Sequence, residues 1–168
     1  MTITKIGSAG YLKDSIWAKV KSILGSTYTD SVLGNKTITY VTGFTKDYES
    51  YINNLPIVFI ESKSRARPQS WEQGGKRKYA RTYHVHIVAG GYVDAANNDL
   101  MKENLTDQIE FGFDQKVYDL INPYTGAVEG KYNTEASVVY RIAPTNIDDF
   151  ERHHSEIAIM ADVKILNS

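Results

Sequence analysis

An alternating run near the middle of the chain reads Tyr79-Ala80-Arg81-Thr82-Tyr83-His84-Val85-His86-Ile87-Val88-Ala89. In an extended conformation, one side of this run carries Tyr83, Val85, Ile87 and Ala89, and the other carries Thr82, His84, His86 and Val88. Aromatic and β-branched residues that recur with a period of two are typical of a half-buried strand. We therefore predict a strand over residues 79–89, which Gly90-Gly91 and Asp94 bring to an end.

A long amphipathic helix is predicted directly after this strand. From about Asn98, apolar residues recur every four positions: Met101, Leu105, Ile109, Phe113, Val117. Leu120 is the last residue of this apolar stripe. At about 1.5 Å per residue, roughly 22 residues would form a helix of about 33 Å. We expect Asn122-Pro123 to end this helix. A strand followed by a helix that packs back on the sheet is the expected nucleus of the fold.

The N-terminal part predicts a second helix. Residues 1–7 are expected to form an arm, and Ser8 is a candidate cap for the helix that follows. Apolar residues at helical spacing form its buried stripe: Leu12, Ile16, Val20, Ile23 and Leu24. Gly25 is expected to end this helix, because glycine is the usual residue just past a helix C-terminus.

Several further strands follow from alternation or from continuous apolar runs. Residues 56–61 form such a continuous run, which predicts a central strand buried on both faces. Alternation predicts strands over 37–41, 138–142 and 155–166. The intervening segments are expected to be a loop (26–36), a short helix or coil (43–54), a hairpin tip (124–136) and a polar loop (143–154). The whole chain, 1–168, is therefore predicted to be a single α+β domain, with a mainly antiparallel or mixed sheet of four to six strands flanked by two helices.

Composition narrows the classes of function. The chain has 168 residues and a formal net charge of −1, and this balance argues against a dedicated nucleic-acid binder. There is no cysteine, which excludes disulfides, thiolate zinc sites and a cysteine nucleophile. No apolar run approaches the ~18 residues that would span a bilayer. The first five residues lack a hydrophobic core, so we expect no signal peptide.

Two pairs of histidines are the best candidates for metal ligands, namely His84-x-His86 and His153-His154. Alternate residues of a strand share a face, so His84 and His86 could hold zinc together with a third ligand. No Asp or Glu beside them completes a facial triad, and we favour a solvent-facing position for both side chains. The usual hydrolase, nucleotide-binding and metalloprotease motifs are also missing. We therefore assign no catalytic, cofactor-binding or metal-ligating residue, and we expect the chain not to be an enzyme.

The segment 62–78 is predicted to be a long basic loop between two strands. Residues 63–81 hold seven cations and one acid, Glu72. Such a loop could bind nucleic-acid phosphates or an acidic protein surface, and it could also be simply solvated. The residues that we assign to an interface with another protein subunit are Arg65, Arg67, Trp71, Lys76, Arg77 and Lys78.

The predicted long helix supplies a candidate complement to this loop. Its acidic residues are spaced four, three and four, and they form one stripe: Glu103, Asp107, Glu110, Asp114. A further line beyond the stripe holds Leu100, Phe111 and Tyr118, which a helix with a single apolar face does not need. We therefore expect a second contact surface here, although a solvated acidic face remains the alternative. An acidic helix of one subunit that meets the basic loop of the next would close into a ring where the rotation permits.

The order of these elements resembles that of the tail terminator, or tail completion, proteins of long-tailed bacteriophages. The likeness rests on an N-terminal amphipathic helix, the Pro-led strand Leu55-Pro56-Ile57-Val58-Phe59-Ile60, and a long loop. It continues with Tyr83-His84-Val85-His86-Ile87, a long helix that ends in Leu120-Ile121-Asn122-Pro123, and a final alternating strand. It covers residues 8–166 and concerns the organisation of the chain.

This resemblance implies a structural protein of the virion tail, assembled in the host cytoplasm. Such proteins form a homohexameric ring on the tail tube, stop its polymerisation and join it to the neck or head. Their tube contacts are made by sheet edges and a long β–β loop, which corresponds here to 62–78. DNA passes through the ring without sequence-specific binding, so the acidic stripe could instead line the channel. The alternatives are another connector, neck or tail tube protein, and a nucleic-acid-binding accessory protein that uses the basic loop.

Overall fold

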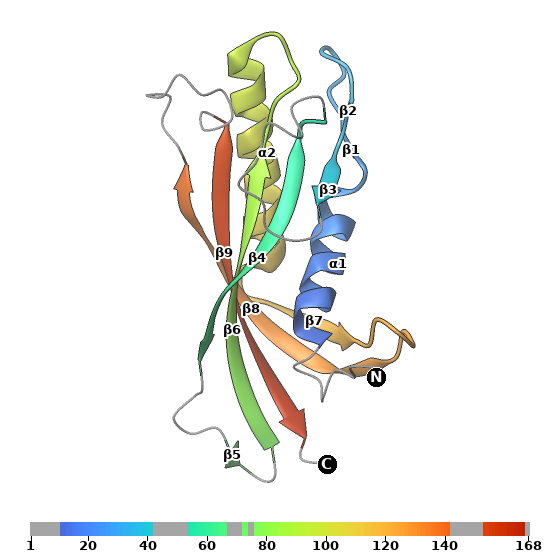
Figure 1. The fold of residues 1–168 in the computed structure, drawn as a ribbon, viewed down its shortest axis with the longest axis vertical. Coiled ribbons are helices and arrows are strands. Elements are labelled where there is room, and N and C mark those ends of the chain that lie inside the picture. The colour runs from blue at the N-terminus through green and yellow to red at the C-terminus, as the bar shows by residue number, and fades with distance from the viewer. Residues whose placement is uncertain (1–10, 42–53, 67–71, 74–75, 142–152, 167–168) are drawn as a thin grey trace, which may run out of the picture.

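The fold combines two helices with a large mixed sheet. The computed structural model describes residues 11–41, 54–66, 72–73, 76–141 and 153–166 (Figure 1). Its elements in chain order are α1 (Leu12–Leu24), β1 (Thr27–Tyr28), β2 (Lys36–Thr37), β3 (Thr39–Val41), β4 (Ile57–Ala66), β5 (Glu72–Gln73), β6 (Lys76–Val88), α2 (Ala95–Phe113), β7 (Lys116–Ile121), β8 (Val128–Arg141) and β9 (His154–Leu166).

The main sheet has the strand order β3-β4-β6-β9-β8-β7, and β5 pairs with β6 beside this path. Only the β3–β4 pairing is parallel among the described pairs, and β1 and β2 form a separate small sheet. The centre is the antiparallel trio β4, β6 and β9, in which Phe59 lies opposite His86 and His86 lies opposite Glu156. This architecture confirms the predicted α+β class.

Both helices pack on one face of the sheet. The buried core joins Ile16 of α1 and Leu105 of α2 to Val58, Val85 and Ile157 of the central strands. The predicted strand run 79–89 and the buried stripes of both helices as far as Phe113 are confirmed by this packing. A smaller buried cluster of Ile57, Phe59 and Val88 lies on the opposite side of the same strands. Residues 57–60 of β4 are therefore buried on both faces of the sheet, as the continuous apolar run over 56–61 predicts.

The segment 62–78 differs from the long loop that we predicted. β4 continues as far as Ala66, which pairs with Ala80, and β6 already begins at Lys76. A pairing shift between Ser62 and Ser64 interrupts the ladder without ending it. Polar and charged residues therefore continue two strands here, because the ladder hydrogen bonds join backbone groups and do not depend on apolar side chains. In Figure 1 the far ends of β6 and β9 run beyond both helices toward β5 and the C-terminus.

The prediction of one helix from Asn98 to Leu120 is wrong at its C-terminal end. α2 ends at Phe113, and residues 116–121 form strand β7, which pairs with β8. Asp114 caps the helix, and Gln115 has a positive φ of 52°, which turns the chain into the strand. Asn122-Pro123 consequently belongs to the turn between β7 and β8. The N–H of Gly126 donates there to the Asn122 carbonyl.

Smaller differences occur in the first 41 residues. Tyr11 is the N-terminal cap residue of α1, in place of the predicted Ser8. Gly25 ends the helix as predicted, and its φ is 73°. The segment 26–36 is not entirely loop, since β1 and β2 pair across it. The predicted arm (1–7) and the segments 43–53 and 143–152 lie outside the described residues.

Among the described residues, no helix is long and apolar enough to cross a membrane.

Candidate functional site

The outward surface of α2 carries two of the predicted contact residues. Leu100 is 51% exposed and Phe111 is 79% exposed. They are eleven residues apart, which is about three helical turns, so both side chains lie on the same side of α2. Tyr118 does not belong to this line, because it lies on β7. Its hydroxyl donates to the Gly112 carbonyl, and its ring packs against Phe113 and Tyr132. The contact surface that the helix provides is therefore shorter than the one predicted.

The predicted acidic stripe borders these apolar residues. Asp107 and Asp114 are exposed, and Glu103 and Glu110 are half-buried. Asp107, Glu110 and Asp114 line a shallow hollow together with Phe111, where the Lys116 ammonium lies 5.0 Å from the centre of the Phe111 ring. Asp114 also has a structural role, since its Oδ1 accepts a hydrogen bond from the Ala136 N–H at 3.3 Å. Three acids and an exposed aromatic ring thus share one patch.

The structure describes the predicted interface in 62–78 only in part. Arg67 and Trp71 lie in the segment that is not described. Arg65 belongs to β4, and Lys76, Arg77 and Lys78 belong to β6, so the backbone of these four positions is placed in the sheet.

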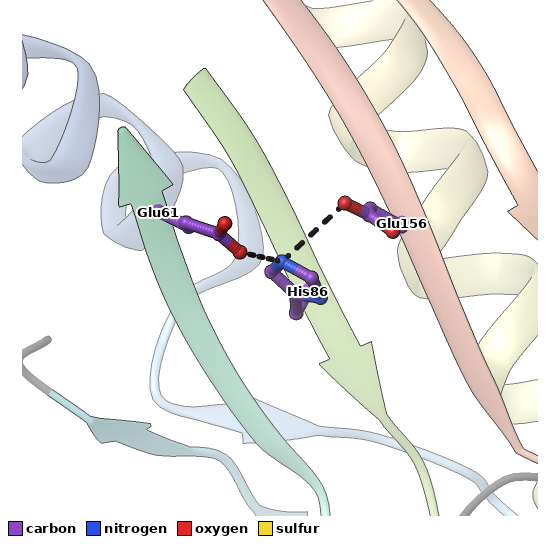
Figure 2. A group of neighbouring side chains, drawn as sticks. All are labelled: Glu61, His86 and Glu156. Carbon is purple, nitrogen blue, oxygen red and sulfur yellow. Dashed lines mark hydrogen bonds and ion pairs between the residues drawn. The ribbon is translucent and has the colours of Figure 1, made fainter. Parts of the chain in front are cut away.

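The second candidate site lies on the sheet face opposite the helices. Strand pairing places His86 of β6 directly across from Glu156 of β9, and places Glu61 of β4 two residues along from the position opposite His86. Alternate residues of a strand point to the same face, so these three side chains converge (Figure 2). His86 Nε2 lies 2.9 Å from Glu61 Oε2 and 3.6 Å from Glu156 Oε1.

Further side chains hold this cluster in place. The second ring nitrogen of His86, Nδ1, is hydrogen-bonded with His154 Nε2 at 3.0 Å. The Phe59 ring stacks on the His86 ring with centres 4.6 Å apart and an angle of 5° between planes. His84 Nδ1 is hydrogen-bonded with Glu156 Oε1. The orientation of His86 is therefore fixed from both of its nitrogens and from one ring face.

Burial shapes the protonation of these groups. Burial lowers the pKa of His86, although the two glutamates beside it act in the opposite direction. Burial and the neighbouring His86 also lower the pKa of His154, to about 4, so its imidazole is neutral near pH 7. Burial alone would raise the pKa of Glu61, but hydrogen bonds from Lys63 and His86 outweigh it and lower that pKa. The cluster therefore brings an ionised carboxyl group against imidazole nitrogen, an arrangement that suits a shared proton or a cation.

The predicted solvent-facing position of His84 and His86 is wrong. His86 is 4% exposed and His84 is half-buried. The sequence pattern around His86 does not point to its partners Glu61 and Glu156, which lie 25 residues before it and 70 residues after it. A signal was present, because all three residues lie on predicted strands, but only the order and register of those strands bring them together.

The described chain is thus an α+β domain with two surface features, an apolar–acidic patch on α2 and a buried histidine–glutamate cluster. No protein-family model matches the sequence, and no curated protein matches it either.

Proposed function

We propose that this chain is a structural protein that assembles with copies of itself into a ring, as tail terminator proteins do. In this proposal the ring caps the end of a phage tail tube, stops its polymerisation and provides the surface to which the neck or head attaches. The observation that carries the proposal is the outer surface of α2, where Phe111 and Leu100 are exposed beside acidic residues. Covering a Phe or Leu side chain contributes roughly 1.5–3 kcal/mol, which favours a partner for this surface.

Charge complementarity indicates that the partner is a second copy of the chain. The patch on α2 presents Asp107, Glu110 and Asp114, whereas residues 63–81 contain seven cations and one acid. One chain therefore carries both an acidic patch on α2 and a cation-rich segment of sequence. A contact between unlike surfaces of identical chains is head-to-tail, and it closes into a ring when the rotation permits.

The exposed edge of the sheet is the surface that we assign to the tail tube. β7 is an edge strand, and exposed apolar side chains lie along it and its hairpin: Val117, Ile121, Tyr124, Val128. An edge strand has unpaired backbone N–H and carbonyl groups, which can pair with another chain. This assignment leaves α2 for the contact between neighbouring subunits.

The test is a tube-polymerisation assay with the tube protein encoded in the same genome. Wild-type chain added during polymerisation should shorten the tubes. Phe111→Ser should abolish this effect, because it removes the largest exposed apolar group of the patch. Val32→Ser is the matched control, since Val32 is 88% exposed on the β1–β2 hairpin and should be dispensable. Tubes of unchanged length with wild-type chain would refute the proposal.

The basic region also favours a second candidate, a DNA-binding accessory protein. A phosphate binder retains DNA at low salt and loses affinity for it steeply as salt rises. The charged part of the proposed subunit contact also weakens with salt, so the readout that separates the two candidates is retention of DNA. Charge reversal at Arg65 and Arg67 would abolish DNA retention under this alternative. Under the ring proposal the same variant instead gives tails of uncontrolled length or failed joining to the head.

A further inference from the structure

The cluster of Glu61, His86 and Glu156 has the donor set and the geometry of a metal site. One ligand atom from each residue lies within 4.8 Å of the other two, and the two distances to His86 Nε2 are 2.9 and 3.6 Å. Two ligand atoms bound to one tetrahedral zinc ion at about 2.1 Å are about 3.4 Å apart. Small rotations of two side chains would therefore bring all three atoms to bonding distance.

The three donors come from a rigid part of the protein. They lie on β4, β6 and β9, which are adjacent strands at the centre of the sheet, and His86 and Glu156 are 4% and 5% exposed (Figure 2). Ligands on paired strands are held more precisely than ligands on loops. The site is not sealed, because the Glu61 side chain is 19% exposed and offers a route from solvent.

The residues around the donors match those that support metal ligands in proteins. A histidine that binds a metal usually donates its other ring N–H to a neighbouring acceptor, which fixes its tautomer. Here His86 Nδ1 meets His154 Nε2 at 3.0 Å, leaving Nε2 directed at the two carboxylates. The Glu156 carboxylate is likewise held by a hydrogen bond, between its Oε1 and His84 Nδ1.

One cation competes for this site. The Lys63 ammonium lies 2.8 Å from Glu61, but it contacts Oε1, whereas Oε2 faces His86. Lys63 is also 41% exposed, so solvent weakens its repulsion of a bound ion. An ion between His86 and Glu61 Oε2 therefore leaves the Lys63 ion pair in place.

We propose that Glu61, His86 and Glu156 bind one divalent transition-metal ion, with zinc as the preferred ion. Imidazole nitrogen favours zinc and its first-row neighbours over magnesium and calcium, which prefer oxygen ligands. Three protein ligands leave the fourth tetrahedral position of zinc to water. The ion would tie β4, β6 and β9 together on the face opposite the helices. This proposal is independent of the ring proposal, and neither depends on the other.

The test is calorimetric titration of the metal-stripped full chain with Zn²⁺ in a buffer that does not bind the metal. Wild-type chain should bind one Zn²⁺ and should bind Mg²⁺ far more weakly. Glu61→Gln keeps the size of the side chain and should raise the zinc Kd at least about tenfold. Glu135→Gln, an exposed position on β8, is the matched control and should leave the Kd unchanged.

Thermal unfolding gives an independent readout of the same variants. Zn²⁺ should raise the Tm of wild-type chain and of Glu135→Gln, because a ligand of the folded state stabilises it. The Tm of Glu61→Gln and of Glu156→Gln should respond less. Glu61 lies at the rim, so its variant remains informative if Glu156→Gln does not fold. The proposal is overturned if wild-type chain shows no saturable binding up to about 1 mM Zn²⁺. Equal zinc affinity in wild-type chain and Glu61→Gln overturns it as well.

Discussion

At the scale of single residues, a buried pair of hydroxyl groups joins α2 to the centre of the sheet. Thr106 and Ser155 are both fully buried, and their side-chain oxygens lie 2.5 Å apart. Thr106 also donates to the Lys102 carbonyl within the helix at 2.6 Å. This buried polar contact helps to fix the position of α2 over β9.

Replacing Thr106 with Val should destabilise the protein by about 1–3 kcal/mol. The change conserves shape but removes the hydroxyl partner of Ser155 at a buried site. Urea unfolding measures the effect, and Ser155→Ala provides the second arm of a double-mutant cycle. The double variant should lose less stability than the sum of the two single variants. Additive losses would show that the two hydroxyl groups do not interact.

Tyr132 should make the protein less stable in alkaline solution. Burial raises its pKa above the ordinary 10.0, with Tyr118 and Asp119 adding to the shift. The folded state therefore keeps the phenol proton at pH values where the unfolded chain loses it, so stability falls as pH rises above 10. Tyr132→Phe should show a shallower fall in urea-unfolding free energy over this range. Identical pH slopes for the two proteins would contradict the assignment.

At the scale of elements, the junction between α2 and β7 shows what sequence patterns do and do not determine. Apolar residues four apart continue past Phe113 to Val117, so the helical period is satisfied, but 116–121 also alternates. Pairing with β8, which follows β7 after a short turn, selects the strand. The helices, the strand 79–89 and their buried faces were predictable because each depends on local periodicity. The cluster at His86 was not, because it depends on register between distant strands.

Gln115 tests this junction directly. Its φ of 52° lies in the left-handed region, which costs an ordinary L-residue about 1–2 kcal/mol relative to glycine. Gln115→Gly should therefore raise the unfolding free energy by about 1 kcal/mol. Gln108→Gly makes the same change at an exposed position inside α2 and should lower it by about 0.5–1 kcal/mol. A loss of stability in both variants would contradict the described turn.

At the scale of the whole molecule, one chain combines an acidic patch with a cation-rich segment of sequence, and this is the pairing on which we base the proposed head-to-tail contact. The acidic patch lies on α2, and seven cations fall within residues 63–81 of the sequence. The apolar side chains of β7 and its hairpin form a third surface, which begins at Val117, just after the acidic patch in the sequence. This distribution is the physical basis of the proposed ring.

A charge exchange across the proposed subunit contact should be reciprocal. Glu110→Lys and Arg65→Glu should each weaken assembly, because each places like charges together. The double variant should recover part of the lost assembly, since it restores opposite charges in reversed order. Light scattering at several salt concentrations measures the assembled fraction. Equal loss of assembly in the single and double variants would show that Glu110 of one subunit does not contact Arg65 of the next.

Negative-stain microscopy of the purified chain mixed with tail tubes tests the ring proposal most directly. We predict six-fold rings, or density that caps one end of each tube, for wild-type chain and for Val32→Ser. Phe111→Ser should leave the tube ends bare. Wild-type chain that stays monomeric and leaves every tube end uncapped would contradict the proposed function.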